Sequence, residues 1–225
     1  MKNPWVIIGI ITVVLFGGAI LISNQSQEQA NQDIEVKKHI KGNESASVKL
    51  VEFSDFQCPA CQAFHPVVTE VINEFGDDLS FEYKHFPLVR AHPNAVSAAV
   101  AAEAAGQQDK FFEFHDLLFD NQSAWSATVS PNQLFIGYAE ELGLDIDKFK
   151  RHMRSSVLED KVKDDLNEGL ERAVTGTPTF FLNGERMTYE TYQEFRDKIA
   201  DAIDPGSSST TSPAGLPETE VKFGI

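Results

Sequence analysis

Alternating apolar and polar residues predict the first strands of this chain. Residues 48–53 alternate and are rich in β-forming side chains, and residues 79–86 repeat that pattern. A helical pattern over residues 58–75 lies between them. A strand, a helix and a strand of these lengths predict a βαβ unit with parallel strands and a right-handed crossover.

Residues 93–172 are predicted to be almost wholly helical, because apolar positions recur there at helical spacing. Strand and turn patterns return after this block, so the predicted order is βαβ, a helical block and ββα. The expected elements of the block and of the last part are helices over 94–106, 109–119, from Ser130, 147–155 and 156–173, strands over 179–182 and 185–187 joined by Asn183-Gly184, and a helix over 189–203.

The N-terminal segment has a different character. Residues 5–22 form an apolar run without a charged residue, about long enough to span a bilayer. Lys2 on the short flank favours a cytoplasmic N-terminus and an extracytoplasmic remainder. A cleaved signal peptide and a buried helix of the fold are the alternatives, but residues 20–24 contain no clear small-x-small cleavage site. We therefore expect a retained membrane anchor.

These patterns divide the chain into five segments. A folded domain is expected where strand and helix patterns occur, and the Ser-, Thr-, Pro- and Gly-rich C-terminal end is too polar to build a core. The predicted segments are a cytoplasmic stub 1–4, a transmembrane anchor 5–23, a polar tether 24–42, one folded domain 43–203 and a disordered tail 204–225.

Composition supports a single globular domain and excludes one class of partner. Apolar residues make up 42% of the 225 residues, and 17 phenylalanines indicate a strongly aromatic core. The formal net charge of -15 argues against nucleic acid as a partner, because non-specific binding needs Lys and Arg to neutralise phosphates.

The two cysteines of the chain, Cys58 and Cys61, are the main candidates for chemistry. Residues at i and i+3 of a first helical turn lie on one face, close enough to form a disulfide without moving the backbone. Free N–H groups and the helix dipole at Cys58 favour its thiolate, so its pKa is predicted to be lowered. Cys61, one turn further in, should be shielded and should attack a mixed disulfide formed on Cys58.

Two other uses of this pair are possible. A purely structural disulfide would close a loop of only four residues, which constrains the unfolded chain very little. A metal site could use Cys58, Cys61 and His65 at i, i+3 and i+7. Zinc would need a fourth ligand, and the sequence has no second Cys-x-x-Cys and no His-x-x-x-His. We therefore expect neither a metal nor a cofactor apart from the redox-active disulfide.

Three motifs in this order of elements resemble the thioredoxin superfamily and, within it, the DsbA-like thiol-disulfide oxidoreductases of bacterial envelopes. They are Glu52 in the first strand, Cys58-Pro59-Ala60-Cys61 and Thr177-Pro178. The resemblance covers roughly residues 43–203. It implies an α/β fold, the thioredoxin fold interrupted by an inserted helical domain at 93–172.

The resemblance also implies roles around the pair. Glu52 would be a buried acid that exchanges a proton with Cys61, whereas the alternative is an edge-strand glutamate facing solvent. Pro178 would be cis and face the pair, and Thr177 would offer its backbone N–H and C=O to an extended substrate peptide.

The two residues between the cysteines bear on how strong an oxidant the disulfide is. Pro59 and Ala60 complete the motif, but Ala60 can neither donate a hydrogen bond nor carry a charge. A very high oxidising strength is therefore not implied.

The six histidines are not expected to carry the chemistry. His85 and His115 are expected to be packing residues and His65 an exposed one, while the remaining histidines, His39, His92 and His152, are expected at the surface.

The expected function is that of an extracytoplasmic enzyme held to the cell membrane by its N-terminal helix. It would donate the Cys58–Cys61 disulfide to cysteine-containing exported polypeptides. Because the chain has only two cysteines, an integral-membrane redox partner would have to regenerate it. The alternatives are a reductase or isomerase on the same scaffold, and a non-catalytic thioredoxin-like binding module or metal chaperone.

Overall fold

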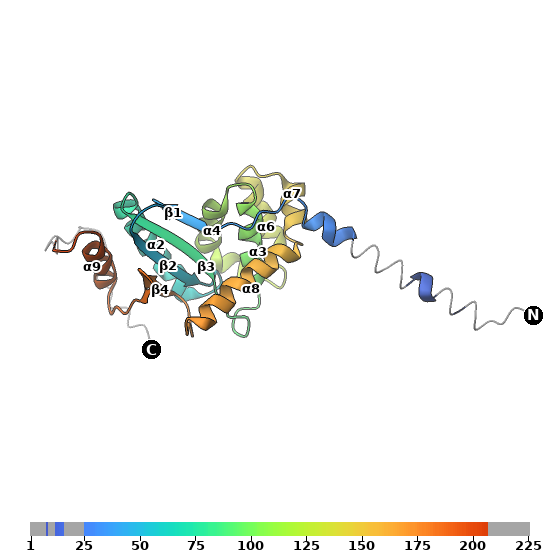
Figure 1. Ribbon diagram of the computed structural model, residues 1–225. Coiled ribbons are helices and arrows are strands. Elements are labelled where there is room, and N and C mark those ends of the chain that lie inside the picture. The colour runs from blue at the N-terminus through green and yellow to red at the C-terminus, as the bar shows by residue number, and fades with distance from the viewer. Residues whose placement is uncertain (1–7, 9–11, 16–24, 207–225) are drawn as a thin grey trace, which may run out of the picture.

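The computed structural model describes residues 8, 12–15 and 25–206, and within them the chain forms one mixed sheet flanked by helices (Figure 1). Strands β2 and β3 pair in parallel, and every other neighbouring pair is antiparallel. The strands lie in the order β1-β3-β2-β4-β5. Their bounds are β1 His39–Gly42, β2 Val48–Ser54, β3 Leu79–His85, β4 Thr179–Leu182 and β5 Glu185–Arg186.

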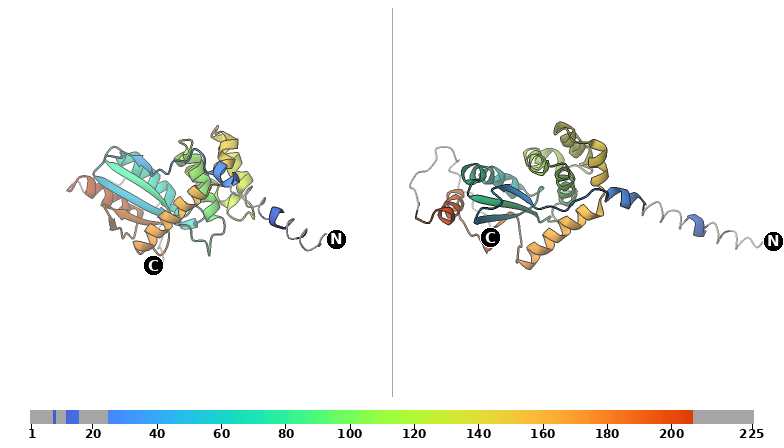
Figure 2. Two further views of the ribbon diagram at one scale, coloured as in Figure 1. Left: turned by 45° about the vertical axis from the view of Figure 1, so that its right-hand side comes forward. Right: turned by 45° about the horizontal axis from the view of Figure 1, so that its top comes forward.

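The helices divide into two groups. Helix α2 connects β2 to β3, and α9 follows the last strand, whereas α3–α7 gather beside one end of the sheet and α8 runs back from them (Figures 1 and 2). The α/β fold class and the inserted helical block are thus confirmed. The bounds are α2 Pro59–Phe75, α3 Ala95–Gly106, α4 Phe111–Asp120, α5 Gln122–Trp125, α6 Asn132–Glu141, α7 Ile146–His152, α8 Ser156–Glu171 and α9 Tyr192–Ile203.

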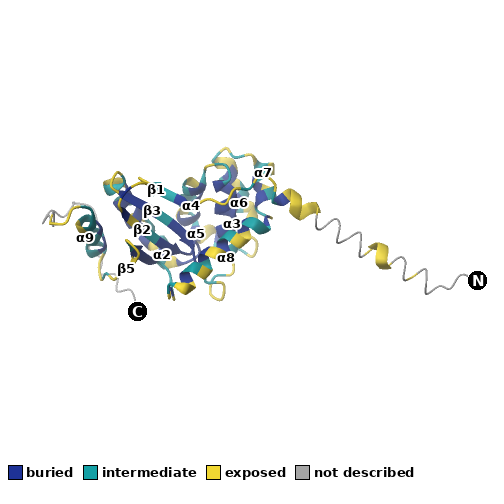
Figure 3. Ribbon diagram, in the orientation of Figure 1, coloured by how far each residue is buried: buried dark blue, intermediate teal, exposed yellow. Residues whose placement is uncertain are grey.

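One face of the sheet builds the main core. Alternation along β2 and β3 puts Leu50, Phe81 and Tyr83 on this face, and all are at most 1% exposed. Phe64 of α2 packs against Phe180 of β4 at 5.1 Å between ring centroids and against Phe195 of α9 at 5.0 Å. Aromatic contacts therefore join both helices to the sheet. Figure 3 colours most of β2 and β3 dark blue, as buried.

The opposite face carries a smaller aromatic cluster under α8. The ring of Phe53 contacts those of Phe86 and Phe181 edge-on at 6.4 and 5.7 Å. Gly169 of α8 lies directly on this cluster, and a Cβ atom at Gly169 would come within 2.5 Å of the Phe86 ring. Glycine therefore lets α8 approach the sheet closely.

The predicted strands and helices are all present, with shifts at their ends. Two of these shifts reach three residues: α7 ends at His152 and not at residue 155, and α9 starts at Tyr192 and not at residue 189. The Thr191 hydroxyl accepts a hydrogen bond from the Glu194 N–H at 3.1 Å, and the Glu194 carboxylate accepts one from the Glu190 N–H at 2.7 Å. Threonine followed three residues later by glutamate is a capping sequence, and it fixes this start.

The predicted polar tether, residues 24–42, is wrong over much of its length. Residues 39–42 form β1 and pair antiparallel with β3. Further upstream, Ala30 is 2% exposed, and Asn31 bonds to the hydroxyls of Ser155 and Ser156 at 2.8 and 3.1 Å. The folded domain therefore begins before residue 43.

A buried carboxylate links this early segment to the helical block. Glu103 of α3 is fully buried, and its two oxygens lie 2.9 Å from Nε2 of His39 and 3.0 Å from Nε2 of His85. Burial favours the protonated carboxyl, but the two histidine hydrogen bonds outweigh it and lower the pKa of Glu103 to about 2. His39 and His152 are both buried, so the expectation that they lie at the surface is wrong.

The predicted ends of the chain fall mostly outside the described residues. Of the anchor 5–23, only residues 8 and 12–15 are described, and of the tail 204–225, only 204–206. In the described part of the chain, no helix has both the length and the apolar character needed to cross a membrane.

A pair of glycine substitutions tests the close contact of α8 with the sheet. Gly169→Ala should lower the free energy of unfolding by about 1–3 kcal/mol, because the added methyl group overlaps the Phe86 ring. Gly137→Ala, in the exposed part of α6 with no atom near the new Cβ, should raise it by up to about 1 kcal/mol. Urea denaturation of the two variants measures both, and a stabilised Gly169→Ala protein would contradict the packing.

Candidate active site

The cysteine pair lies at the N-terminal end of α2. Cys58 is the N-cap residue in extended conformation, and Pro59, which needs no hydrogen-bonded N–H, begins the helix. Both cysteines are free thiols. Cys58 is 7% exposed and Cys61 only 1%, so the outer sulfur alone is placed for attack by a large partner.

The Cys58 thiolate is strongly stabilised. Its largest stabilising contact is a hydrogen bond from the Cys61 thiol; burial opposes the charge, and the Thr177 side chain and the backbone N–H groups of Cys61 and Ala60 support it. Together these lower the pKa of Cys58 to about 5. The predicted direction agrees, but the neighbouring thiol contributes more than the helix terminus that the sequence suggested.

The pKa of Cys61 is shifted in the opposite direction. Complete burial raises its pKa well above that of a free thiol, and the hydrogen bond it gives to Cys58 and the charges of Cys58 and Glu52 raise it further. At neutral pH the pair therefore holds one thiolate, on Cys58, and one thiol, on Cys61.

Glu52 lies in the interior, contrary to the edge-strand alternative. It is 4% exposed and belongs to β2, which is paired on both sides, with Tyr83 of β3 and Phe180 of β4 as register partners. Burial raises the pKa of Glu52 to about 7, against a weaker lowering by Ser54. Such a carboxyl can both accept and donate a proton near neutral pH.

The turn before β4 completes the group. The Thr177–Pro178 peptide bond is cis. The carbonyl oxygen of Thr177 lies 3.5 Å from Sγ of Cys58, although the two residues are far apart in sequence. The hydroxyl of Thr179 donates to the carbonyl of Gly176 at 2.8 Å and so fixes the turn. The structure thus brings Glu52, both cysteines and this turn together.

Sequence reasoning missed the buried polar residues that hold the cysteine loop. Asp55 accepts hydrogen bonds from the backbone N–H groups of Gln57 and Leu88, both at 2.8 Å, and lies 2.7 Å from Nδ1 of His92. The sequence signal that could have found Asp55 was an acidic residue in a segment whose pattern otherwise predicts burial. His92, expected at the surface, is instead part of this support.

Amides from the helical block reach the same loop. Gln122 of α5 donates to the carbonyls of Phe56 and Cys58 at 2.7 and 3.0 Å. Gln57 in turn donates to the carbonyl of Ser126 and accepts from the Asn94 N–H, both at 2.7 Å. The inserted helices therefore position the backbone on either side of the cysteines.

The alternative metal site does not assemble. His65 is turned away from the sulfurs, with Nε2 3.6 Å from a carboxylate oxygen of Asp116 and its ring 5.1 Å from that of His115. Over the described residues, two groups of three potential ligands come together, His65–His115–Asp116 and His85–Glu103–Asp165. Neither includes a cysteine.

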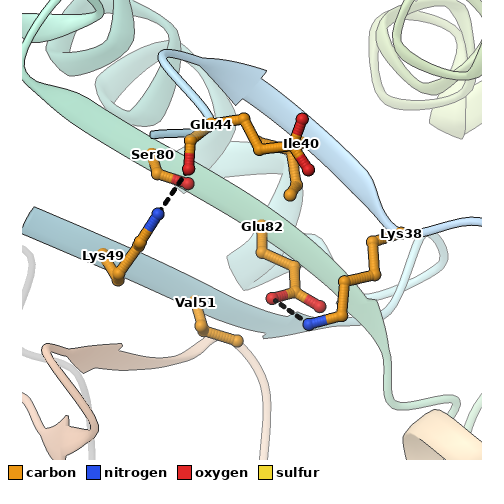
Figure 4. Close-up of a pocket in the computed structure, with 7 residues that line it drawn as sticks. All are labelled: Lys38, Ile40, Glu44, Lys49, Val51, Ser80 and Glu82. Atoms are coloured by element: carbon orange, nitrogen blue, oxygen red, sulfur yellow. Dashed lines mark hydrogen bonds and ion pairs between the residues drawn. The ribbon is translucent and has the colours of Figure 1, made fainter. Parts of the chain in front are cut away.

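A hollow of about 350 Å³ lies on the sheet face away from the cysteines (Figure 4). Lys49 and Val51 line it, and they alternate along β2 with Leu50 and Glu52, which face the other way. An ion pair between Lys38 and Glu82 at 3.5 Å crosses the hollow. The sheet thus separates it from the thiols.

A mixed sheet, a cis-proline turn and an unequal thiol pair at a helix terminus define a thioredoxin-type thiol site. The model of the thioredoxin family matches residues 35–201, so the chain belongs to this family.

Solved structures share the fold. BdbD from Bacillus subtilis in its oxidised form matches with a TM-score of 0.66 and 22% identity, over 74% of this chain and 92% of that one. α-DsbA1 from Wolbachia pipientis matches with a TM-score of 0.65 and 20% identity, over 78% and 95%. MdbA, a thiol-disulfide oxidoreductase from Corynebacterium diphtheriae, matches with a TM-score of 0.60 and 17% identity, over 76% and 98%. The fold is therefore the DsbA-like form of the thioredoxin fold.

Curated relatives are much longer proteins. The Na(+)/H(+) antiporter NhaA 1 of Salinispora arenicola is 40% identical over 150 residues, which is 67% of this chain and 22% of that protein. The Na(+)/H(+) antiporter NhaA 1 of Mycobacterium sp. strain KMS is 41% identical over 155 residues, 67% of this chain and 24% of that protein. The chain thus spans less than a quarter of either relative.

Alkylation of the reduced protein tests the thiolate and its main support. Cys58 should react with iodoacetamide in a pH profile whose midpoint is about 5, since only the thiolate is nucleophilic. Cys61→Ala removes the hydrogen-bond donor and should move the midpoint upward, towards that of an ordinary thiol. Cys61→Ser keeps a donor and should move it less. A wild-type midpoint above 8, or identical shifts in both variants, would contradict the assignment.

Proposed function

We propose that this protein is an extracytoplasmic thiol-disulfide oxidoreductase that donates its Cys58–Cys61 disulfide to other proteins. The observation that carries the proposal is the unequal pair of thiols, with a stabilised thiolate on Cys58 and a buried thiol on Cys61. Stabilising the reduced form makes the corresponding disulfide a stronger oxidant.

The reaction consists of two thiol-disulfide exchanges. A substrate thiolate attacks Sγ of Cys58 in the disulfide, the Cys58–Cys61 bond breaks, and Cys61 leaves with the bonding electrons and takes up a proton. A second substrate thiolate then attacks the substrate sulfur of the mixed disulfide. Cys58 leaves as its thiolate, so the substrate is oxidised to a disulfide and the protein is reduced to the dithiol.

The turn at Thr177 suits an extended substrate. Its carbonyl lies 3.5 Å from Sγ of Cys58, so a peptide pairing with the backbone before Pro178 would bring its own sulfur close to Cys58. Thr177 and Pro178 are therefore assigned to substrate binding, with Pro59 and Ala60 as the supporting loop.

The apolar N-terminal run supports the proposed location and partners. The apolar run over residues 5–22 supports a membrane anchor, and Lys2 supports a cytoplasmic N-terminus. The substrates would then be cysteine-containing exported polypeptides. An integral-membrane redox partner would accept the electrons.

The midpoint potential is the direct test of direction. Residues 25–206, equilibrated in glutathione buffers, should show a midpoint above about -200 mV, on the oxidising side of the glutaredoxins. The physical reason is the low pKa of Cys58, while Ala60, whose side chain gives no hydrogen bond, keeps the protein from the extreme of DsbA at about -120 mV. A midpoint near the thioredoxin value of about -270 mV would assign the reductase alternative instead.

A variant without the second cysteine tests the roles of the two sulfurs in the same assay. Cys61→Ser cannot form the disulfide and should accumulate one glutathione per molecule on Cys58. Absence of glutathione on the Cys61→Ser variant, or stable glutathione on both cysteines of the wild type, would contradict the roles given to the two sulfurs.

A further inference from the structure

Two buried hydroxyl groups beside the active site lack hydrogen-bond partners. Ser54 and Tyr83 are each 1% exposed, and over the described residues neither Oγ of Ser54 nor the phenol oxygen of Tyr83 makes a hydrogen bond. A buried hydroxyl without a partner costs free energy, so its retention calls for a functional or solvent-linked explanation. The mechanism described above uses neither group.

Both hydroxyls lie on the sheet face that carries Glu52. Ser54 is two residues after Glu52 on β2 and therefore points to the same side. Tyr83 is the register partner of Glu52 on the neighbouring strand β3. Helix α2 covers this face and contributes Cys61, which is 1% exposed. A carboxyl, a thiol and two hydroxyls thus share one enclosed space.

The Ser54 hydroxyl influences the pKa of all three other groups. Burial is the largest influence on the pKa values of Glu52, Cys61 and Tyr83 and raises each of them, and in each case the Ser54 hydroxyl acts in the opposite direction. Because Ser54 Oγ shares this face with Glu52 and Tyr83 and has no fixed hydrogen-bond partner, rotation about its C–O bond can direct its proton to different neighbours.

The ring of Tyr83 keeps its hydroxyl at this place. It stacks on Phe56 with 5.2 Å between centroids and 19° between planes, and His115 contacts it edge-on at 4.9 Å. Burial and the charges of Glu52 and Cys61 raise the pKa of Tyr83 well above that of free tyrosine. Tyr83 therefore remains a neutral hydroxyl that can accept one proton while it gives up another.

We infer that the hydroxyls of Ser54 and Tyr83 transfer the proton that moves between Cys61 and Glu52 when the Cys58–Cys61 disulfide forms or breaks. The inference rests on the proposed exchange chemistry and adds two proton-transfer residues to it. When Cys61 leaves as a thiolate, the Glu52 carboxyl gives a proton to the hydroxyls and the hydroxyls give one to Cys61. When Cys61 attacks Cys58, the proton moves in the reverse direction and the displaced sulfur leaves as a thiolate.

The other titratable groups near this space either keep one protonation state or already have a partner. From the loop before α9, Tyr189 is raised in pKa by burial and by the charges of Glu52 and Cys61, so it stays protonated. From α4, His115 is lowered to a pKa of about 4 by burial, so it is neutral. Asp55 is bonded to His92, as described above.

Two groups on the neighbouring elements complete this environment. Cys58 is a thiolate or part of a disulfide at neutral pH. His85 of β3 lies 3.0 Å from the buried Glu103 carboxylate. Glu52, with its pKa of about 7, is thus the group suited to exchange a proton with Cys61.

The test is the pH dependence of one step in the full chain. Oxidised glutathione is added to the reduced protein, and release of glutathione from the Cys58 mixed disulfide by Cys61 is followed in a stopped-flow instrument. Ser54→Ala and Tyr83→Phe should each slow this release on the order of 10-fold or more at pH 7. The difference should shrink above about pH 9, where hydroxide removes the Cys61 proton directly.

A double variant and a matched control make the result specific. Glu52→Gln should slow release at pH 7, and adding Ser54→Ala to it should slow release little further, because both changes interrupt one route. Tyr138→Phe, which removes a phenol that packs on Phe114 in the helical block, should leave the rate unchanged.

The outcomes separate this inference from the proposed function. The role of the hydroxyls is overturned if both single variants release glutathione at the wild-type rate at pH 7, or if the slowing is equal at every pH. In that case, glutathione release by the wild type and the midpoint potential of the protein still support an oxidase. Because the two hydroxyls are removed independently, a variant that does not fold leaves the other as the test.

Discussion

The hydrogen bond from the Cys61 thiol to the Cys58 thiolate is the interaction on which the whole site depends. A hydrogen bond to an ionised acceptor is roughly twice as strong as a neutral one. It exists only while Cys61 keeps its proton, and burial under the first turn of α2 ensures this. This hydrogen bond lowers the pKa of Cys58 and so makes Cys58 a good leaving group. The pKa of its donor, Cys61, is raised, so Cys61 is a poor leaving group until a proton is supplied. This explains why an ionisable carboxyl is buried behind the pair.

The rest of the fold holds the cysteine loop in the geometry this bond requires. The sheet contributes Glu52 from a strand paired on both sides, and the inserted helices contribute Gln122, whose amide donates to the Cys58 carbonyl. Glu103 ties the same helical block to β1 and β3 through two histidines. Gln122, Glu103 and the two histidines are buried and hydrogen-bonded, so they specify one arrangement where apolar packing alone would allow several.

Local patterns predicted the strand and helix order, the lowered pKa of Cys58, the burial of Cys61 and the place of the Thr177-Pro178 turn, because strand alternation, helical spacing and motif spacing are properties of neighbouring residues. They could not predict long-range polar pairing. His39 looked like part of a tether because its partner Glu103 is 64 residues away. The contribution of Cys61 to the thiolate exceeded that of the helix terminus because it depends on burial, which only the tertiary structure defines. The capping sequence at Thr191 was readable, and its omission misplaced the start of α9.

The most direct measurement is the urea denaturation of the reduced and the disulfide-bonded protein at pH 7 and at lower pH. The pKa of Cys58 is lowered to about 5 in the folded state, so the thiolate stabilises the reduced fold above that pH, and this contribution is lost as the pH falls through about 5. A four-residue loop constrains the unfolded oxidised chain little. The reduced form should therefore unfold at the higher urea concentration at pH 7, with a gap that narrows towards pH 5. A more stable oxidised form, or a gap independent of pH, would contradict this account.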